Sequence, residues 1–178
     1  MRKSITATLL AGVCGLLTAC AAPKVHEYQA AKPELDLVRY FSGQTEAWGM
    51  FQQRGGKVVK RFKVDITGTY QQGALVLDER FVYDDGSTQQ RVWTLRQGSD
   101  GRWRGTAADV EGEALGEVAG NALNWRYTLR LPVDGKTYHM QFDDWMFLID
   151  EKTMINRASM SKFGIELGEV TLFFRKKE

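Results

Sequence analysis

Residues 73–98 read GALVLDERFVYDDGSTQQRVWTLRQG, two runs of alternating apolar and polar residues on either side of residues 84–86. Alternation with a period of two is typical of a β-strand that has one buried face. A three-residue loop ending in glycine at position 86 places Leu77 opposite Trp93. A two-residue loop would set Leu77 against Thr94 instead, so the apolar pattern favours the first register. The stretch therefore predicts a β-hairpin.

The same register places an acid opposite a base on the apolar face of the hairpin. Glu79 lies across from Arg91, among Leu77, Phe81 and Trp93. A buried carboxylate is costly unless it is paired, and a guanidinium on the neighbouring strand is a natural partner. Two roles are open: a structural ion pair that fixes the register, or a polar contact for the head group of an apolar ligand.

The rest of the chain repeats the strand pattern. A turn at Asp134-Gly135 places Leu131 opposite Tyr138 and Trp125 opposite Asp144. About eight to ten strands joined by tight turns predict an all-β antiparallel meander, which is too long to stay flat and is expected to close into a lipocalin-like barrel. Further strands are predicted over residues 45–54, 57–71, up to 103, 121–132, on both sides of 150–152, and 170–175.

One short helix is predicted before the first strand. Residues 33–41 begin with Pro33, and Leu35, Val38 and Phe41 recur at nearly helical spacing. We expect this helix to cover one end of the barrel.

The first twenty residues have the pattern of an export signal. Arg2 and Lys3 precede a short apolar run over residues 5–17, which is too short to span a membrane. Residues 17–20, LTAC, resemble the lipobox of bacterial lipoproteins, in which the cysteine, here Cys20, is lipidated. An ordinary cleaved signal peptide with a chance cysteine is the alternative.

These features predict three segments: a lipoprotein signal peptide over residues 1–19, a lipidated cysteine and tether over 20–32, and a single barrel domain over 33–178. In lipoproteins, Ala21 after the cysteine favours sorting to the outer membrane. The expected location is therefore the cell envelope, with the domain anchored to the outer membrane by its lipid and facing the periplasm.

Charge and cysteine content exclude several classes of function. Signal cleavage would reduce the 24 Lys and Arg residues to 22, equal to the 22 Asp and Glu residues. No net field then attracts nucleic acid or anionic lipid. Cys14 leaves with the signal and Cys20 would be acylated, so no disulfide is expected. Only His26 and His139 are present, and no histidine triad, metal cluster or cofactor motif is apparent.

Residues 112–122 form an unusual strand region. Every second position, from Gly112 through Gly116 and Gly120 to Ala122, is small apart from Val118. Missing side-chain bulk in a strand indicates a bend, a bulge or close approach by something large. That volume is either filled by neighbouring tryptophans or left as ligand space.

Other polar residues are secondary candidates. If Asp144 points inward it lies near Trp125 and could meet Asn156 or Arg157 on the next strand. Asp109 is a third possible interior acid. Structural hydrogen bonding at the rim of the barrel is the simpler role for these residues. Asn121 is expected to cap a bend.

Six stretches resemble one family: FSGQTEAWGMF (41–51), LDERFVYDDG (77–86), RVWTL (91–95), GNALNWRY (120–127), DDWMF (143–147) and NRASMSKFG (156–164). The family consists of proteobacterial lipoproteins known only as a domain of unknown function. The resemblance implies a lipocalin-type barrel. It also implies a link to membrane fatty-acid modification, because members tend to be encoded beside enzymes such as relatives of cyclopropane synthase. It supplies no catalytic residue.

Three functions follow, in order of preference. The first is a non-catalytic lipoprotein whose barrel binds a small apolar or acyl-chain ligand. Its polar contacts would be Glu79, Arg91 and Asp144, and its wall Leu77, Phe81, Trp93, Trp103, Trp125, Tyr127 and Phe142. The second is a structural or partner-binding envelope protein with a filled core. The third is a lipid-modifying enzyme that uses Glu79 or Asp144 as general acid or base.

Overall fold

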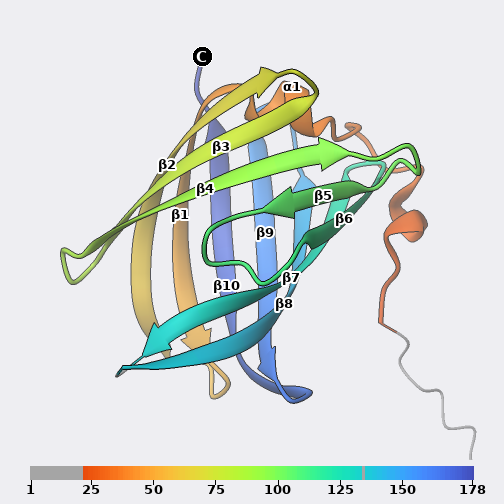
Figure 1. The fold of residues 1–178 in the computed structure, drawn as a ribbon. Helices are drawn as coiled ribbons and strands as arrows, with labels where there is room; N and C mark the ends of the chain where they lie inside the picture. Colours follow the sequence, from red (N-terminus) through yellow and green to blue (C-terminus); the bar gives the residue numbers. More distant parts are fainter. Residues whose placement is uncertain (1–21, 134) are drawn as a thin grey trace, which may run out of the picture.

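The chain forms a closed barrel of ten antiparallel strands in the computed structural model, which describes residues 22–133 and 135–178 (Figure 1). Each strand pairs with the next, and β1 pairs with β10 to close the sheet. The predicted all-β meander barrel is confirmed. The strands are β1 (Gly43–Gln53), β2 (Val58–Gln71), β3 (Ala74–Tyr83), β4 (Thr88–Gln97), β5 (Trp103–Thr106), β6 (Ala114–Ala119), β7 (Ala122–Val133), β8 (Lys136–Leu148), β9 (Thr153–Lys162) and β10 (Ile165–Lys176).

The β3–β4 hairpin has the predicted register. Leu77 lies opposite Trp93 and Glu79 opposite Arg91. The connecting loop has three residues, and Gly86 adopts a φ of 81°, a left-handed conformation that glycine enters without steric cost. The apolar pattern was therefore sufficient to choose between the two loop lengths.

The β7–β8 hairpin also has the predicted register, with Leu131 opposite Tyr138 and Trp125 opposite Asp144. The predicted turn includes Asp134, which lies outside the described residues. The predicted signal peptide and Cys20 also lie outside them.

One end of the barrel is closed by the short helix α1 (Leu37–Phe41), and we call it the closed end (Figure 1). The helix begins four residues after Pro33, later than predicted. The Asp36 side chain caps it by accepting a hydrogen bond from the Arg39 backbone N–H (3.0 Å). The Leu35 N–H donates a hydrogen bond to the Gly120 carbonyl (2.8 Å) instead of taking part in the helix, so the chain stays extended up to residue 36.

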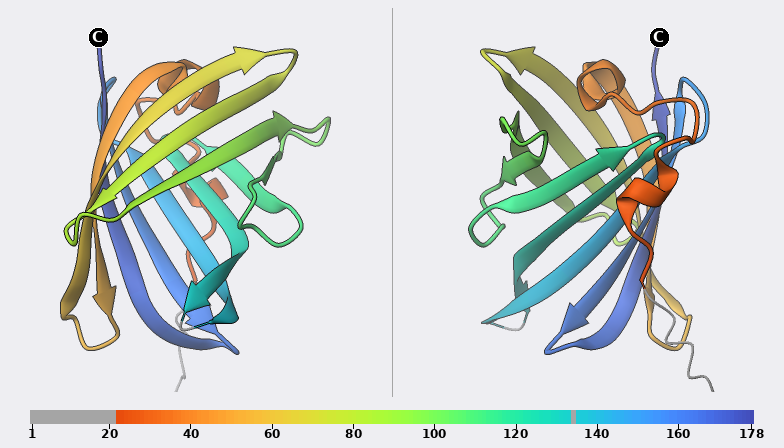
Figure 2. Two further views of the ribbon diagram at one scale, coloured as in Figure 1. Left: turned by 60° about the vertical axis from the view of Figure 1, so that its left-hand side comes forward. Right: turned by 90° about the vertical axis from the view of Figure 1, so that its right-hand side faces the viewer.

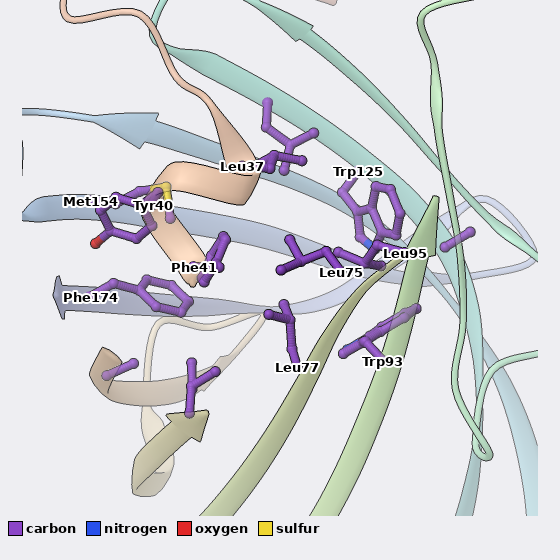
Figure 3. Packing of buried hydrophobic residues seen from close by; sticks show 14 of the residues in the cluster. Leu37, Tyr40, Phe41, Leu75, Leu77, Trp93, Leu95, Trp125, Met154 and Phe174 are labelled. Carbon is purple, nitrogen blue, oxygen red and sulfur yellow. The ribbon is translucent and has the colours of Figure 1, made fainter. Parts of the chain in front are cut away.

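The main core fills the closed end. Tyr40 and Phe41 of α1 lie beside Met154 and Phe174 of the barrel wall (Figure 3). The Phe41 and Phe174 rings meet edge to face with centroids 6.2 Å apart. The opposite end, which we call the mouth, carries the β1–β2, β3–β4, β7–β8 and β9–β10 turns (Figure 2).

The segment before the helix packs against the outside of the barrel. A 3₁₀ turn, η1 (Val25–Tyr28), places Val25 in a small buried cluster with Ala119 and Ala122. The Tyr28 ring contacts Trp145 and Phe147 (centroids 5.8 and 5.2 Å apart). Part of the segment predicted as a tether is thus attached to the barrel wall.

The barrel wall is irregular between β4 and β7. The strands β5 and β6 pair only near the closed end, and toward the mouth the gap is spanned by residues 107–113, which we call the seam loop (Figure 1). The seam loop is tied to β7 by a bridge between Val110 and Leu129 and by two backbone hydrogen bonds, from Glu111 N–H to Thr128 and from Arg130 N–H to Asp109.

Residues 22–178 contain all ten strands and the whole described core. A chain that starts at residue 22 therefore keeps every contact described here.

Candidate functional site

The barrel contains a cavity of about 790 Å³ that reaches from the mouth to Leu37 and Phe41 of α1. Small-molecule sites are typically concave, mostly apolar and about 300–1,000 Å³ in volume. The barrel is therefore not filled throughout, which the sequence alone did not decide. The cavity is lined by inward-facing side chains of nearly every strand, among them Phe51, Phe62, Leu77, Phe81, Trp93, Trp125, Tyr127, Leu131, Met140, Phe142, Met160 and Leu172.

Six of the seven predicted wall residues line the cavity, whereas Trp103 does not; the six are Leu77, Phe81, Trp93, Trp125, Tyr127 and Phe142. The Trp103 side chain is buried at the closed end of β5, opposite Gln97 and Gly116, where the core is filled. Alternation correctly placed Trp103 on the inner face but could not tell how deep the cavity extends.

Aromatic rings form one wall of the cavity. Trp93 meets Trp125 and Tyr127 edge to face, with centroids 5.8 and 5.5 Å apart. Tyr127 stacks on Phe142 (5.2 Å). Such pairs stabilise each other beyond their burial, so this wall is rigid.

The small residues of β6 do not create ligand space. A Cβ atom at Gly116 would lie 2.2 Å from the Trp125 indole, so the glycine makes room for that ring. At Gly120 a Cβ atom would meet the Tyr28 carbonyl oxygen at 1.9 Å. Of the two roles considered for residues 112–122, the structure supports close packing by protein atoms.

Arg91 points into the barrel but pairs mainly with Asp109 rather than with Glu79. Its Nε and Nη2 atoms donate to the Asp109 carboxylate at 3.0 and 2.8 Å. The distance from Arg91 Nη1 to Glu79 Oε2 is 3.9 Å, and no hydrogen bond joins them. The register placed Glu79 opposite Arg91 correctly, but the bidentate partner comes from the seam loop.

This geometry follows from the end of the β4–β5 ladder. The two strands pair from Gln97 to Thr94, so Arg91 lies beyond the last pair and faces the seam loop. A guanidinium that grips a carboxylate with two parallel hydrogen bonds is strongly favoured over a single distant contact. The Arg91–Asp109 pair therefore fastens the seam loop to β4.

Asp144 lines the cavity and is 5% exposed. It accepts a hydrogen bond from the Asn156 amide and a long one (3.4 Å) from the Tyr127 hydroxyl. Of the two neighbours considered from sequence, Asn156 is the partner. Arg157 points outward and pairs with Glu169.

Two interior carboxyl groups have strongly shifted pKa values. Burial raises the pKa of Glu79 to about 7, although the nearby Arg91 charge opposes the shift. Burial likewise raises the pKa of Asp144 to about 7, against the hydrogen bonds from Asn156 and Tyr127. Burial would lower the pKa of Arg91, but the Asp109 hydrogen bonds and the Glu79 charge raise it overall, so Arg91 stays charged.

Sequence reasoning missed several residues near the mouth. Lys60, Gln89 and Arg130 bring polar atoms to the upper cavity, and Met140, Met160 and Leu172 supply flexible apolar surface. Strand alternation could have placed most of them on the inner face. Arg130 lies among the outward-facing positions of β7 and still reaches the lining, because its guanidinium donates to the Ala108 carbonyl of the seam loop (2.6 Å).

Two other predicted residues serve structure. The Asn121 amide donates to the Leu148 carbonyl (3.0 Å), which caps the bend between β6 and β7 as expected. His139 lies on the outer surface beside Glu111. In the described part of the chain, no three His, Cys, Asp or Glu side chains converge as a metal site would need, and no helix has the length and apolar character to cross a bilayer.

Comparison with solved structures shows a shared fold. The S-type phycobiliprotein lyase CPES from Guillardia theta superposes with a TM-score of 0.57 at 6% identity, over 88% of this chain and 99% of that one. Two other structures superpose less closely. EF1p2_mFAP2b bound to DFHBI has a TM-score of 0.44 at 9% identity, over 80% of this chain and 100% of that one. The ywiB protein from Bacillus subtilis has a TM-score of 0.36 at 13% identity, over 76% of this chain and 91% of that one.

No curated protein matches this chain. A family defined from sequence does match it, over residues 14–176, which is nearly the full length. The family is described as a protein of unknown function, in agreement with the resemblance seen in the sequence motifs. This chain therefore belongs to the DUF3833 family.

Proposed function

We propose that this protein binds a small, largely apolar molecule, such as an acyl chain, in the cavity of its barrel. The observation that carries the proposal is the cavity of about 790 Å³, closed at one end by α1 and lined mainly by aromatic, leucine and methionine side chains. Apolar surface facing an empty lumen gains free energy when a ligand covers it, at about 25 cal/mol per Å².

The lumen supports an unbranched, flexible ligand over a flat rigid one. One side of the cavity is the rigid aromatic wall around Trp93 and Tyr127, and the other carries Met140, Met160 and Leu172, whose side chains adapt to irregular shapes. An adaptable wall suits an alkyl chain that adopts many conformations.

The location is part of the proposal. We infer that Cys20 is lipidated and holds the domain at the outer membrane, facing the periplasm. The support is the basic start, the short apolar run and the LTAC sequence of residues 17–20. Incorporation of labelled palmitate into the wild type, and its loss in Cys20→Ala, checks this point. Labelled Cys20→Ala protein would contradict it.

A direct test of ligand binding uses residues 22–178 purified from cells without detergent. Native mass spectrometry is expected to show a mass above that of the polypeptide, and organic extraction should release an apolar compound. Replacing Leu131 and Met160 with tryptophan, which we call the cavity-filled variant, narrows the cavity toward the mouth and should strongly reduce the added mass. If the wild-type chain carries no ligand and takes up none from an envelope lipid extract, the proposal fails.

The family resemblance adds a physiological expectation. If the ligand is an intermediate or product of fatty-acid modification, deleting the gene should change the fatty-acid composition of the membrane. Complementation with the cavity-filled variant should not restore it, whereas the wild type should.

A partner-binding function is the second candidate, and an exposed patch on the outer wall favours it. Trp48, Ile155 and Phe173 are 43%, 42% and 42% exposed on neighbouring strands, and the Trp48 and Phe173 rings lie 6.1 Å apart. Exposed apolar patches often mark interaction sites. In this case Phe173→Ser would abolish capture of an envelope partner, whereas the cavity-filled variant would not.

A further inference from the structure

The acidic side chains of the cavity lie below its upper wall, where Lys60, Gln89 and Arg130 supply the polar atoms. Along β7 and β8 the pairs from the mouth inward are Leu131–Tyr138, Leu129–Met140, Tyr127–Phe142 and then Trp125–Asp144. On β3 and β4, Tyr83 and Phe81 come before Glu79 on the same path. A molecule that enters through the mouth therefore passes the basic side chains of the upper wall before it meets the acids, and the apolar side chains of α1 line the cavity beyond them. We call Glu79, Arg91, Asp109, Asp144 and Asn156 the cavity floor.

The charges of the cavity floor are unbalanced. Three carboxyl groups face one guanidinium, and that guanidinium is already occupied. Arg91 uses Nε and Nη2 on Asp109, its Nη1 lies nearest Glu79, and its plane lies over the Phe81 ring (5.4 Å to the centroid). A ligand carboxylate would have to displace Asp109 to reach it, leaving another buried anion unpaired.

Acceptor atoms, by contrast, are available. Among the described residues Glu79 makes no hydrogen bond, and its side chain is 15% exposed, facing the cavity. One Asp144 oxygen has only the 3.4 Å contact with the Tyr127 hydroxyl. The electron-rich faces of the nearby aromatic rings also favour a cation over an anion.

We propose that the ligand is a single-chain amphiphile of the alkyl-ammonium class, which enters with its cationic, hydrogen-bond-donating head first and places it between Glu79 and Asp144. This inference rests on the proposed function and specifies its ligand. The head donates to the two carboxylates, and the chain lies along the apolar side chains of the upper wall toward the mouth.

Binding should strengthen as pH rises from 6 to 8. The floor acids lose their protons in this range, because burial holds the pKa values of Glu79 and Asp144 near 7. The charged and titratable groups that face them are Arg91, Asp109, Tyr83 and Tyr127, and Asp143 adds its charge from the outer face of the sheet. The alkyl-ammonium head keeps its charge throughout, so the change comes from the protein.

The test compares decylammonium, decanol and decanoate on residues 22–178 by titration calorimetry at pH 8. Decylammonium is expected to bind at least about tenfold more tightly than decanoate, equivalent to about 1.4 kcal/mol. Asp144→Asn should remove most of this preference, and the affinity for decanol, which has no charge, should fall much less than the affinity for decylammonium. Asp143→Asn is the matched control, because its side chain lies next in the chain but on the outer face.

The outcomes separate the two claims. Decanoate binding as tightly as decylammonium, or a preference that survives both Asp144→Asn and Glu79→Gln, overturns the choice of head group and leaves the apolar cavity in place. Failure of all three chains to bind counts against the proposed function itself.

A separate observation concerns the rim of the mouth. The β1–β2 turn is joined to β10 there by the hydrogen bond from Arg54 N–H to the Leu167 carbonyl (2.9 Å), and the β9–β10 turn lies farther along the same rim. Together they expose large apolar side chains, which we call the rim patch: Val58 (40%), Val59 (47%), Phe163 (89%) and Ile165 (56%).

Phe163 is held at the tip in an unfavourable backbone conformation. Its φ is 52°, a left-handed value that glycine or asparagine adopts far more readily than an aromatic residue. Phe163 and Gly164 form the two-residue loop of the β9–β10 hairpin, and a tight turn of this kind needs a positive φ at both positions (52° and 76°). The turn therefore sets the conformation of Phe163, and it projects the ring into solvent.

Three basic residues lie at the two tips. Lys162 is next to Phe163, and Arg54 and Lys57 are on the β1–β2 turn. None of the three pairs with an acid in the described part of the chain. Lys162 Nζ lies over the Phe163 and Tyr138 rings (5.2 and 4.4 Å). An exposed aromatic residue flanked by bases has the chemistry of an interfacial membrane contact with anionic lipid.

We infer that the rim patch docks on an anionic bilayer surface, with the Phe163 ring among the head groups. This contact points the mouth of the cavity toward the membrane. It does not depend on the identity of the ligand, because it rests only on the turns at the rim.

Co-sedimentation of residues 22–178 with vesicles tests this contact without the lipid anchor. Binding to phosphatidylcholine vesicles that contain phosphatidylglycerol is expected, with loss in high salt. Phe163→Asn should reduce binding at least about fivefold. The same change should keep or raise the Tm, since asparagine relieves the left-handed strain.

Phe173→Ser on the outer wall is the control and should bind vesicles as the wild type does. Equal vesicle binding by wild type and Phe163→Asn would overturn the inference, as would a wild-type chain that ignores anionic vesicles.

Discussion

At the scale of single residues, the Arg91 ion pair shows what a strand register specifies and what it leaves open. The pattern of residues 73–98 was enough to bring Glu79 and Arg91 to opposite positions. It could not select the side-chain partner, because Asp109 belongs to an irregular loop whose path no periodicity describes. The Arg91 guanidinium binds the Asp109 carboxylate, because that carboxylate accepts two hydrogen bonds from it.

Double-mutant cycles should rank the two acids by their coupling to Arg91. We expect the Arg91–Asp109 coupling energy to be about 2 kcal/mol and the Arg91–Glu79 coupling energy to be clearly smaller. Arg91→Met alone should destabilise the fold by about 3 kcal/mol, because it leaves buried carboxylates unpaired. Urea unfolding of Arg91→Met, Asp109→Asn, Glu79→Gln and the double variants measures these energies. A larger coupling to Glu79 would contradict the geometry.

The two raised carboxyl pKa values predict how stability changes with pH. The folded chain holds protons on Glu79 and Asp144 up to a pKa of about 7, whereas the unfolded chain releases them near pH 4. The stabilisation that comes from protons held on Glu79 and Asp144 is therefore complete below pH 4 and is lost as pH rises through 7. Between pH 5 and pH 8 we expect the free energy of unfolding to fall, by on the order of 3 kcal/mol per group.

Asp144→Asn isolates one of these contributions. The amide keeps an acceptor for Asn156 but cannot ionise, so the variant should lose less stability than the wild type between pH 5 and pH 8. Asp143→Asn, on the outer face, should follow the wild-type curve. Denaturant unfolding at each pH supplies the curves, and parallel curves for the wild type and Asp144→Asn would refute the assignment.

At the scale of elements, most strands and both analysed hairpin registers were predictable, because the residues alternate cleanly and the turns contain glycine. The limits of β5 and β6 were not. Their length depends on where the ladder gives way to the seam loop, which is a tertiary property. The helix was placed early for a similar reason, since the Leu35 hydrogen bond to the β6–β7 turn is invisible in the local sequence.

The close contact between β6 and Trp125 predicts a specific sensitivity. Gly116→Ala would place a methyl group against the rigid indole, at an expected cost of about 1–3 kcal/mol from overpacking. Gly55→Ala is the matched control, because nothing lies within 4 Å of the added atom. Thermal unfolding and the near-ultraviolet circular dichroism of the tryptophans should change for Gly116→Ala alone. An unaffected Gly116→Ala variant would show that the indole moves freely.

At the scale of the whole molecule, the barrel combines a packed core around α1 with a cavity that runs from α1 to the mouth. Hydrophobic pattern predicts that side chains point inward, but whether they meet across the lumen depends on barrel diameter and on what covers the ends. The sequence therefore identified Trp93, Trp125, Tyr127 and Asp144 as interior residues. The location and depth of the empty volume needed coordinates.

Because the barrel contains this cavity, its free energy of unfolding should depend on whether a ligand is bound there. Ligand bound at 100 times its dissociation constant adds about 2.7 kcal/mol to the free energy of unfolding. The protein purified from cells should therefore melt at least several degrees above the same protein after solvent extraction and refolding. The cavity-filled variant with tryptophan at Leu131 and Met160 should melt at one temperature before and after extraction. Identical melting of extracted and unextracted wild type would indicate an unoccupied lumen.

The seam loop has a consequence for divergence among family members. An insertion in a ladder of hydrogen bonds forms a bulge or shifts the register, whereas a surface loop accepts added residues at little cost. Because residues 107–113 form part of the lumen wall and are joined to β4 by the single Arg91–Asp109 pair, lengthening them would enlarge the binding space with every strand unchanged. Variation in molecular size among the compounds carried by different relatives should thus track the length of this one connection.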